Sequence, residues 1–289
     1  KEEFPNSKLT MVISSISKDL ISMIDFIDEF IVSNNKVITI NRINSQKFDL
    51  ILNFSPLKGK SYKYFLKAHR KINIVYTSRY KKNLSSYKIK LFFLNFFFDR
   101  NYLNKRNSIS NLTHQTIYMN EILKLEQISS FKTPRKVDLN LNNKIKYDCL
   151  IHLSNRWINS EYLHNDLILL IEEISKKLKR ISFTTDMLIS DNIKKVIKTI
   201  KSNKNYNLIL QPKFKSWINL IDQSKLIITP ECGCSHICGL LNKDAIIIYD
   251  RNNKPDFIKR EYQPYLAKRI IKINSALGKD QNKKILSYL

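Results

Sequence analysis

The first half of the chain alternates short apolar runs with segments in which apolar residues recur at helical spacing. The apolar runs are rich in Ile, Leu and Val and are flanked by polar residues, a pattern typical of buried strands. The predicted strands span 8–14, 47–55 and 72–77, and the predicted helices span 18–30, 61–70 and 113–128. Strands that alternate with helices indicate βαβ units and a parallel sheet.

The second half repeats this alternation more regularly and predicts a doubly wound α/β domain. The predicted strands span 147–154, 180–186, 206–212, 225–230 and 244–250, and the predicted helices span about 161–179, 191–202, 216–224 and 235–242. Between the halves, the segment 131–146 is polar, aperiodic and contains a proline, as interdomain linkers often do. We therefore expect two Rossmann-like domains, at 1–130 and 147–289, that face a cleft.

Residues 80–105 interrupt the alternation, because aromatic residues lie among basic ones in the stretch YKIKLFFLNFFFDRNYLNKR. Two interpretations are open. The segment is either a buried strand with charged flanks or a loop that faces a lipid or an acceptor, since aromatic side chains beside Lys and Arg suit a membrane interface.

The formal net charge of +25 over 289 residues favours an anionic partner, such as a phosphorylated substrate, an anionic membrane or nucleic acid. Joint enrichment in Lys, Asn and Ile is typical of AT-rich coding, so part of this charge is expected to be solvated surface. The interpretation as a nucleic-acid-binding α/β protein is therefore supported by charge alone and is the less favoured alternative. The four cysteines are too few and too clustered for a disulfide framework and indicate reduced thiols in the cytoplasm.

No apolar run reaches the roughly 18 residues of a membrane-spanning helix, and the polar start KEEFPNSKL does not resemble a signal peptide. Because the chain begins without Met and its first residues, KEEFPNS, resemble the end of a helix followed by a loop, we expect that upstream residues are missing. These would include the opening strand of the first domain.

The stretch PECGCSH, at 230–236, combines a predicted strand end, a glycine and a predicted helix start. Loops of this kind bind anions in doubly wound sheets, because a helix N-terminus presents free N–H groups and partial positive charge. Gly233 would allow a tight turn and close approach of a ligand, and Ser235 would cap the helix. His236 would donate to an anionic oxygen, and Glu231 would accept from sugar hydroxyls.

Two other interpretations of this stretch are weaker. The spacing C-x-C-x-H-x-C offers soft ligands, but zinc sites usually combine C-x₂₋₄-C pairs with a second pair downstream, and the sequence has none. A catalytic thiol paired with a histidine would need an orienting partner, and none is visible in the sequence.

Several stretches, in order along nearly the whole chain, resemble glycosyltransferase family 9, the bacterial heptosyltransferases that build lipopolysaccharide cores. The matching stretches are FPNSKLTMVIS, IDFIDEFIV, KFDLILNFS, THQTIYMNEILKLEQI, LSNRWINSEYL, ECGCSHICGLLNKDAIIIYD and YQPY. The most specific is the sixth, which is similar to the family pattern D-[TS]-G-x-x-H followed by a strand.

The resemblance implies a GT-B fold, an inverting transfer from an ADP-activated heptose or related nucleotide sugar, and an anionic glycolipid acceptor. It implies that the enzyme needs no metal or other cofactor and binds no nucleic acid. It also implies a cytoplasmic enzyme that is peripheral on the inner face of the bacterial inner membrane. At the positions that match family motifs, it implies donor contacts from Ser154, Arg156, Glu231, Cys232, Gly233, Ser235 and His236.

Three departures from the family pattern stand out. Glu231 replaces an Asp and adds a methylene, and Cys232 replaces a Thr or Ser and supplies only a weak donor. The general base of the family lies in a G-x-G-D-like loop after the first strand, and this chain does not contain that loop. The catalytic base is therefore unknown, and a non-catalytic sugar-nucleotide or glycan-binding homologue is the alternative.

Other candidates have a structural interpretation beside the functional one. Thr184 and Thr185 lie at the end of a predicted strand and either face the nucleotide or cap the strand end. Arg156 either contacts the donor phosphates or stacks on Trp157. His152 lies inside an apolar strand and is expected to be a buried, hydrogen-bonded core residue. The predicted acceptor contacts, for lipid-core phosphates, are Lys60, Lys63, Lys67 and Arg70.

Overall fold

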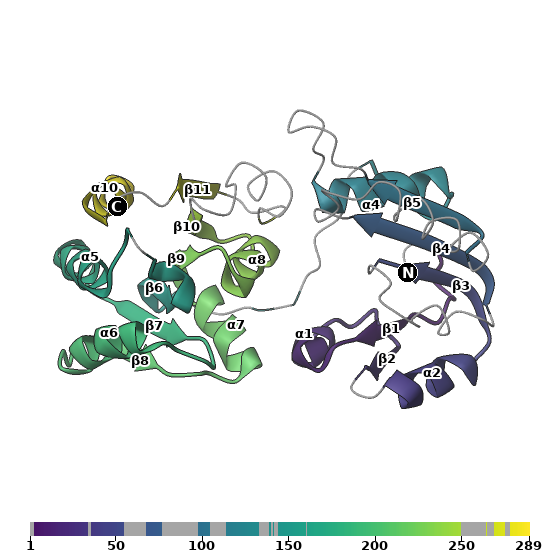
Figure 1. Cartoon of the computed structure of the whole chain (residues 1–289), viewed down its shortest axis with the longest axis horizontal. Helices are drawn as coiled ribbons and strands as arrows, with labels where there is room; N and C mark the ends of the chain where they lie inside the picture. The colour runs from purple at the N-terminus through teal and green to yellow at the C-terminus, as the bar shows by residue number, and fades with distance from the viewer. Residues whose placement is uncertain are drawn as a thin grey trace. The chain divides into compact units, whose positions relative to one another are not determined.

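The computed structural model of the protein divides into two compact units, Lys1–Arg135 and Lys136–Leu289 (Figure 1). The residues that it describes are 3–33, 36–54, 68–76, 98–104, 114–132, 139, 141, 144–159, 161–249, 264, 269–274 and 278–289. In this part of the chain, no helix is long and apolar enough to cross a membrane.

The N-terminal unit contains two parallel sheets. Strands β1 (Thr10–Ile13) and β2 (Glu29–Val32) form a two-stranded sheet. Strands β3 (Phe48–Asn53), β4 (Ala68–Tyr76) and β5 (Arg100–Asn104) form a three-stranded sheet in that order. The described helices are η1 (Ser15–Ser17), α1 (Lys18–Ile21), α2 (Lys36–Asn44) and α4 (Gln115–Leu125).

Helix α4 lies against β4 and forms the core of this unit with it. Ile72 and Ile74 on β4 are fully buried, and Ile122 on α4 packs against them. The predicted helix at 113–128 is thus confirmed, with shorter ends, because its apolar residues recur once per turn on the face toward the sheet.

One sequence prediction in this unit is wrong, and a second is contradicted over the few of its residues that the structure describes. The helix expected at 18–30 ends at Ile21, and Glu29–Val32 is a strand instead, because its β-branched residues pair with β1 and Asp28 accepts a hydrogen bond from the Leu9 amide (2.6 Å). The helix expected at 61–70 lies outside the described residues up to 67, and from Ala68 the chain is strand β4. Of the aromatic segment 80–105, the structure describes only residues 98–104, in which Phe98 is buried.

The C-terminal unit is a six-stranded parallel sheet with strand order β11-β10-β9-β6-β7-β8. Its strands are β6 (Tyr147–Leu153), β7 (Ile181–Thr185), β8 (Asn207–Ile209), β9 (Ser224–Pro230), β10 (Asp244–Tyr249) and β11 (Arg269–Asn274). Its helices are η4 (Asn155–Trp157), α5 (His164–Lys177), α6 (Asp191–Lys201), α7 (Phe214–Asp222), α8 (Gly233–Leu240) and α10 (Gly278–Leu286). The chain adds strands to one side of β6 and then returns to its other side, so the order reverses between β6 and β9.

Helices cover both faces of this sheet, as expected for a doubly wound domain (Figure 1). Helices α5, α6 and α10 share one core, and α7 and α8 pack against each other, with α7 on β9 and α8 on β9 and β10. The four predicted helices and five predicted strands of this unit are all present. Strand β11 and helix α10 were not predicted.

Helix α10 packs closely against α5 where Gly278 approaches Asp166. We predict that Gly278→Ala destabilises this packing. A Cβ atom there would lie 2.2 Å from Cγ of Asp166, whose carboxylate accepts a hydrogen bond from the Leu163 amide at the start of α5 (2.8 Å). Displacing the carboxylate removes this cap, so we expect a loss of about 1–2 kcal/mol of unfolding free energy in a urea titration. An unchanged midpoint would show that Asp166 moves aside without losing its cap.

Candidate functional site

Arg156 and Glu231 meet at the carboxyl end of the sheet, at the point where the strand order reverses. Arg156 follows β6 in η4, and Glu231 follows β9 directly. Nη1 of Arg156 donates to Oε2 of Glu231 (2.6 Å) and to its backbone carbonyl (2.5 Å). The arginine side chain is still 59% exposed, and its Nε and Nη2 make no hydrogen bond to the described residues. In open α/β sheets, ligands bind at this reversal point, so the arginine is placed to meet one.

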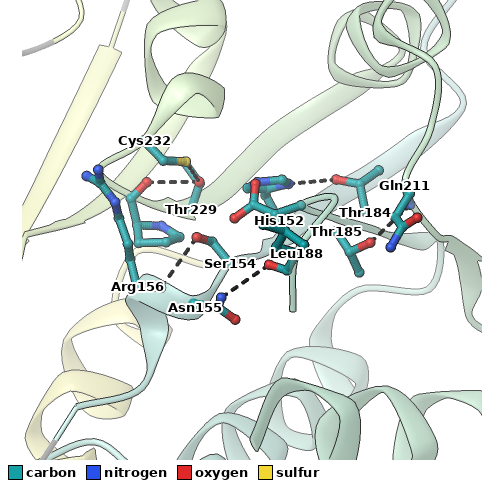
Figure 2. A network of polar contacts seen from close by, with 12 residues as sticks. His152, Ser154, Asn155, Arg156, Thr184, Thr185, Leu188, Gln211, Thr229 and Cys232 are labelled. Atoms are coloured by element: carbon teal, nitrogen blue, oxygen red, sulfur yellow. Dashed lines mark hydrogen bonds and ion pairs between the residues drawn. The ribbon is translucent and has the colours of Figure 1, made fainter. Parts of the chain in front are cut away.

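The turn after β6 is held by its own side chains (Figure 2). The Arg156 amide donates to Oγ of Ser154, which caps η4 (3.4 Å). Nδ2 of Asn155 donates to the Leu188 carbonyl (3.1 Å), which ties this turn to the loop after β7. Trp157 is buried, and its Nε1 donates to the His152 carbonyl (2.7 Å). Trp157 is buried in the core. The guanidinium of Arg156 contacts Glu231 rather than stacking on this tryptophan.

The start of α8 differs from the sequence prediction in two details. Cys232 is the N-cap and Gly233 the first helical residue, so the helix begins two residues before the predicted Ser235. Ser235 instead donates from Oγ to the Cys232 carbonyl (2.8 Å). The φ angle of Gly233 lies outside the left-handed region, so the turn does not require glycine, and a Cβ there would meet only Trp217, at 3.9 Å.

His236 lies in the first turn of α8, with its Nε2 3.9 Å from Oε1 of Glu231. Loss of hydration lowers the pKa of His236, and Arg156 adds to this effect although Glu231 opposes it. The imidazole is therefore mainly neutral at pH 7 and offers one N–H donor. Arg156, Glu231 and His236 thus form a row across the switch point, with the carboxylate between two donors.

His152, at the end of β6, is buried behind this row. Its Nδ1 lies 3.1 Å from Oγ1 of Thr184 (Figure 2). Its Nε2 lies 3.0 Å from Oδ1 of Asp186. Burial acts to lower the pKa of His152, but hydrogen bonds and charge from Asp186 and Cys232 outweigh it and raise this pKa to about 9. The prediction of a buried, hydrogen-bonded histidine is confirmed. The contact with Asp186 was not predicted, because Asp186 follows a different strand, β7, and is distant in sequence.

Two further polar groups are buried at this end of the sheet. The ring of Trp217 lies 5.4 Å from that of His152, and its Nε1 has no hydrogen-bond partner among the described residues. The Tyr249 hydroxyl, at the end of β10, is buried and likewise has no partner in the described part of the chain. Burial raises the pKa of Tyr249, and the charge of Glu231 adds to this effect.

The other predicted site residues take different positions. Thr184 and Thr185 are buried, and Thr185 Oγ1 accepts from the Gln211 amide (3.0 Å), so both hydroxyls serve the protein's own contacts. Arg70 lies near the amino end of β4, and its guanidinium pairs with buried Glu126. The other three predicted acceptor contacts, Lys60, Lys63 and Lys67, lie outside the described residues.

The C-x-C-x-H-x-C stretch does not converge on one point. Cys234 and Cys238 are buried in the core, whereas His236 on the same helix is exposed. Within the ranges that the structure describes, no group of three or more His, Cys, Asp or Glu side chains is arranged to hold a metal ion.

No family model and no curated protein sequence matches this chain. Solved structures match it over 99% of its length. Escherichia coli heptosyltransferase WaaC with ADP is 10% identical, with 89% of that chain covered and a TM-score of 0.69. The same protein with ADP-2-deoxy-2-fluoro heptose is 13% identical, with 91% covered and a TM-score of 0.69.

Two other solved structures agree with this comparison. E. coli ADP-heptose lipopolysaccharide heptosyltransferase II is 9% identical, with 99% of this chain and 89% of that chain covered and a TM-score of 0.70. A family 9 glycosyltransferase from Veillonella parvula is 15% identical, with 99% and 85% covered and a TM-score of 0.66. The chain therefore has the GT-B fold of these heptosyltransferases, which confirms the predicted fold class.

Proposed function

We propose that the chain is a metal-independent, inverting glycosyltransferase that moves a heptose or related sugar from an ADP-sugar to an anionic glycolipid acceptor. The observation that supports this most directly is the row of Arg156, Glu231 and His236 at the switch point, in a fold shared with heptosyltransferases solved with ADP and an ADP-heptose analogue. The acceptor would be part of a lipopolysaccharide core or another surface glycan, reached by peripheral contact with the inner face of the bacterial inner membrane.

The proposed reaction is a direct displacement. An acceptor hydroxyl attacks the anomeric carbon, the bond to the β-phosphate oxygen breaks, and ADP leaves with the extra negative charge. The N–H groups of Arg156 that no described residue holds, and the N–H groups in the first turn of α8, stabilise that charge, which is usually the largest catalytic contribution in such a site. Glu231, held by Arg156, accepts from sugar hydroxyls, and His236 donates to an anionic oxygen. The residue that takes the acceptor proton is not assigned.

Nucleotide selectivity tests this proposal. We expect calorimetric titrations of the chain with ADP, UDP, GDP and CMP to give tight binding of ADP alone. ADP release from ADP-heptose in the presence of a deacylated lipopolysaccharide core would then test transfer. Binding of ADP without transfer would favour the non-catalytic alternative. A folded chain that binds none of the four nucleotides, or binds UDP as tightly as ADP, would contradict the proposal.

Gly233→Ala separates ligand binding from folding. The added Cβ meets nothing closer than 3.9 Å within the protein, and alanine favours a helix more than glycine, so we expect the melting temperature to stay equal or rise. A phosphate that approaches the first turn of α8 would meet the methyl group, so we expect ADP affinity to fall about tenfold. Unchanged affinity would show that the ligand does not approach α8 here.

A further inference from the structure

We propose that a cavity at the amino end of the three-stranded sheet binds a phosphate group through Arg70 and Arg100. The cavity measures about 640 Å³, a volume typical of ligand sites and larger than a phosphate ion. Its walls come from the neighbouring strands β4 and β5, near the points where they begin, and from the end of helix α4 beside them (Figure 1).

The register of the sheet puts both arginines on the face that α4 covers. Ile72 on β4 pairs with Arg100 on β5, and Arg70 precedes Ile72 by two residues. Side chains alternate along a strand, so all three lie on the same face of the sheet. Ile72 is buried in the core under α4, whereas Arg70 and Arg100 lie beyond the end of this core and line the cavity.

Glu126 holds one wall of the cavity in place. Its side chain is only 4% exposed, and its carboxylate accepts hydrogen bonds from Nη2 of Arg70 and from the Tyr102 hydroxyl. Charge-assisted hydrogen bonds of this kind fix the geometry of a guanidinium group. Nε and Nη1 of Arg70 make no hydrogen bond to the described residues, so they are available to a ligand.

Arg100 is the second cation of the cavity. Its side chain is exposed, and its guanidinium makes no hydrogen bond or ion pair with another residue in the part of the chain that the structure describes. The hydrogen bond to Glu126 and burial raise the pKa of Tyr102, and the charges of Arg100 and Arg70 oppose this effect, so both arginines lie near the same phenol. Two guanidinium groups, each a planar fork of N–H donors, thus border one cavity and suit a phosphate.

The charges around the cavity leave it positive. Glu126 compensates one of the two arginines, and the partial negative charge at the end of α4 offsets only part of the other. Asp99 precedes Arg100 but accepts a hydrogen bond from the Lys71 amide (2.5 Å) and does not line the cavity. An anionic ligand is therefore favoured.

The rim of the cavity indicates a ligand larger than an ion. Leu125, at the end of α4, is 67% exposed and lines the cavity, so it offers an apolar surface to the rest of the ligand. A phosphorylated sugar in solution and the headgroup of a phospholipid present the same phosphate chemistry. Parallel α/β sheets bind their substrates at the carboxyl ends of the strands, so this site at the amino end does not depend on the proposed function.

Calorimetric titration of the whole chain with glucose 6-phosphate tests the site. Phosphates are also expected to bind at the switch point, so the titration uses Arg156→Ala protein. We expect one equivalent to bind. Glucuronate, a sugar of similar size with one negative charge instead of nearly two, should bind at least about tenfold more weakly. Equal binding of glucuronate would overturn the assignment to phosphate.

Substitutions in the same background locate the binding. We expect Arg100→Ala to lower the affinity about 10- to 100-fold and Arg100→Lys to lower it less. Arg70→Ala combined with Glu126→Gln removes the other guanidinium without leaving a buried carboxylate unpaired, and should also weaken binding. Arg42→Ala, which removes a half-exposed arginine on α2, is the matched control and should bind like its parent. Arg100→Ala that binds as Arg42→Ala does would overturn the proposal.

Vesicle flotation identifies the source of the phosphate. The probes are phosphatidylcholine vesicles that contain either phosphatidic acid, a phosphate monoester, or phosphatidylglycerol, a diester. Preferential binding to phosphatidic acid that Arg100→Ala loses would indicate a lipid headgroup, whereas binding of glucose 6-phosphate alone would indicate a soluble ligand. Vesicle binding that Arg100→Ala retains would show general attraction by the net charge of +25 and would overturn the lipid source.

Two outcomes separate this proposal from the proposed function. A chain that binds neither glucose 6-phosphate nor phosphatidic acid through Arg100 would overturn the phosphate site, even where ADP binds. A chain that binds either probe through Arg100 but never binds ADP would leave the phosphate site standing and remove the proposed function.

Discussion

Arg156→Ala is expected to weaken ADP binding by about 10- to 100-fold, the value of a hydrogen-bonded ionic contact worth about 1.5–3 kcal/mol. Among the described residues, Glu231 holds Nη1 of the guanidinium and no residue holds the remaining donors, which are available to a phosphate. The substitution also leaves the Glu231 carboxylate without its cation beside the ligand, which adds repulsion. Calorimetric titration with ADP measures the change.

Three variants make this prediction specific. Arg156→Lys keeps the charge but not the planar fork, so we expect an intermediate loss. Arg156→Ala combined with Glu231→Gln removes the uncompensated carboxylate and should recover part of the affinity. Lys225→Ala deletes an exposed cation at the opposite end of β9 and should bind ADP like the wild type. Arg156→Ala that binds ADP as Lys225→Ala does would contradict the role of Arg156.

We expect Arg156→Ala to leave stability almost unchanged, because exposed ion pairs contribute about 0–1 kcal/mol. The affinity loss can therefore be measured on a folded protein. This combination, a large effect on binding with a small effect on folding, is the one expected of a residue that contacts a ligand.

The sequence predicted the C-terminal sheet well because its strands are buried on both faces. β10, with the sequence DAIIIY, is buried at every position after Asp244, and an apolar run of this kind that follows a helical pattern is typical of a parallel sheet covered on both faces. Helix α6 was equally clear, since Ile193, Val196, Ile197 and Ile200 form one apolar stripe. The N-terminal unit was harder, because in 18–30 a short helix and a strand together imitate helical spacing.

The sequence predicted those site residues that lie close together in the chain or directly after a predicted strand. Glu231, Gly233 and His236 lie in one turn, and Arg156 follows a strand that pairs with β9. The charge of His152 is set by Asp186, 34 residues away, and no local pattern announces that contact. Ser235 is a residue type that favours the N-cap, but it lies at the third helical position, where its hydroxyl accepts from the Cys232 amide (3.4 Å) and donates to the Cys232 carbonyl.

His152→Gln is expected to lower the unfolding free energy of the C-terminal unit by about 2–3 kcal/mol at pH 6–7. The histidine is buried, which acts to lower its pKa, but Asp186 and Cys232 outweigh burial and raise this pKa to about 9, above the ordinary value of about 6.5 for histidine. Glutamine keeps one donor toward Asp186 but removes the positive charge. Both tryptophans lie in this unit, so denaturation followed by tryptophan fluorescence reports on it alone.

The pH dependence identifies the charge as the cause. A histidine whose folded pKa is raised contributes stability that is complete below its unfolded pKa, near 6.5, and is lost as the pH rises through about 9. The wild type should therefore lose stability between about pH 7 and 10, and His152→Gln should lose much less over that range. His164→Gln, at the start of α5, serves as the matched control and should retain the decline of the wild type. If His152→Gln declined as steeply as the wild type, the imidazolium–Asp186 pair would not be the source of the stability.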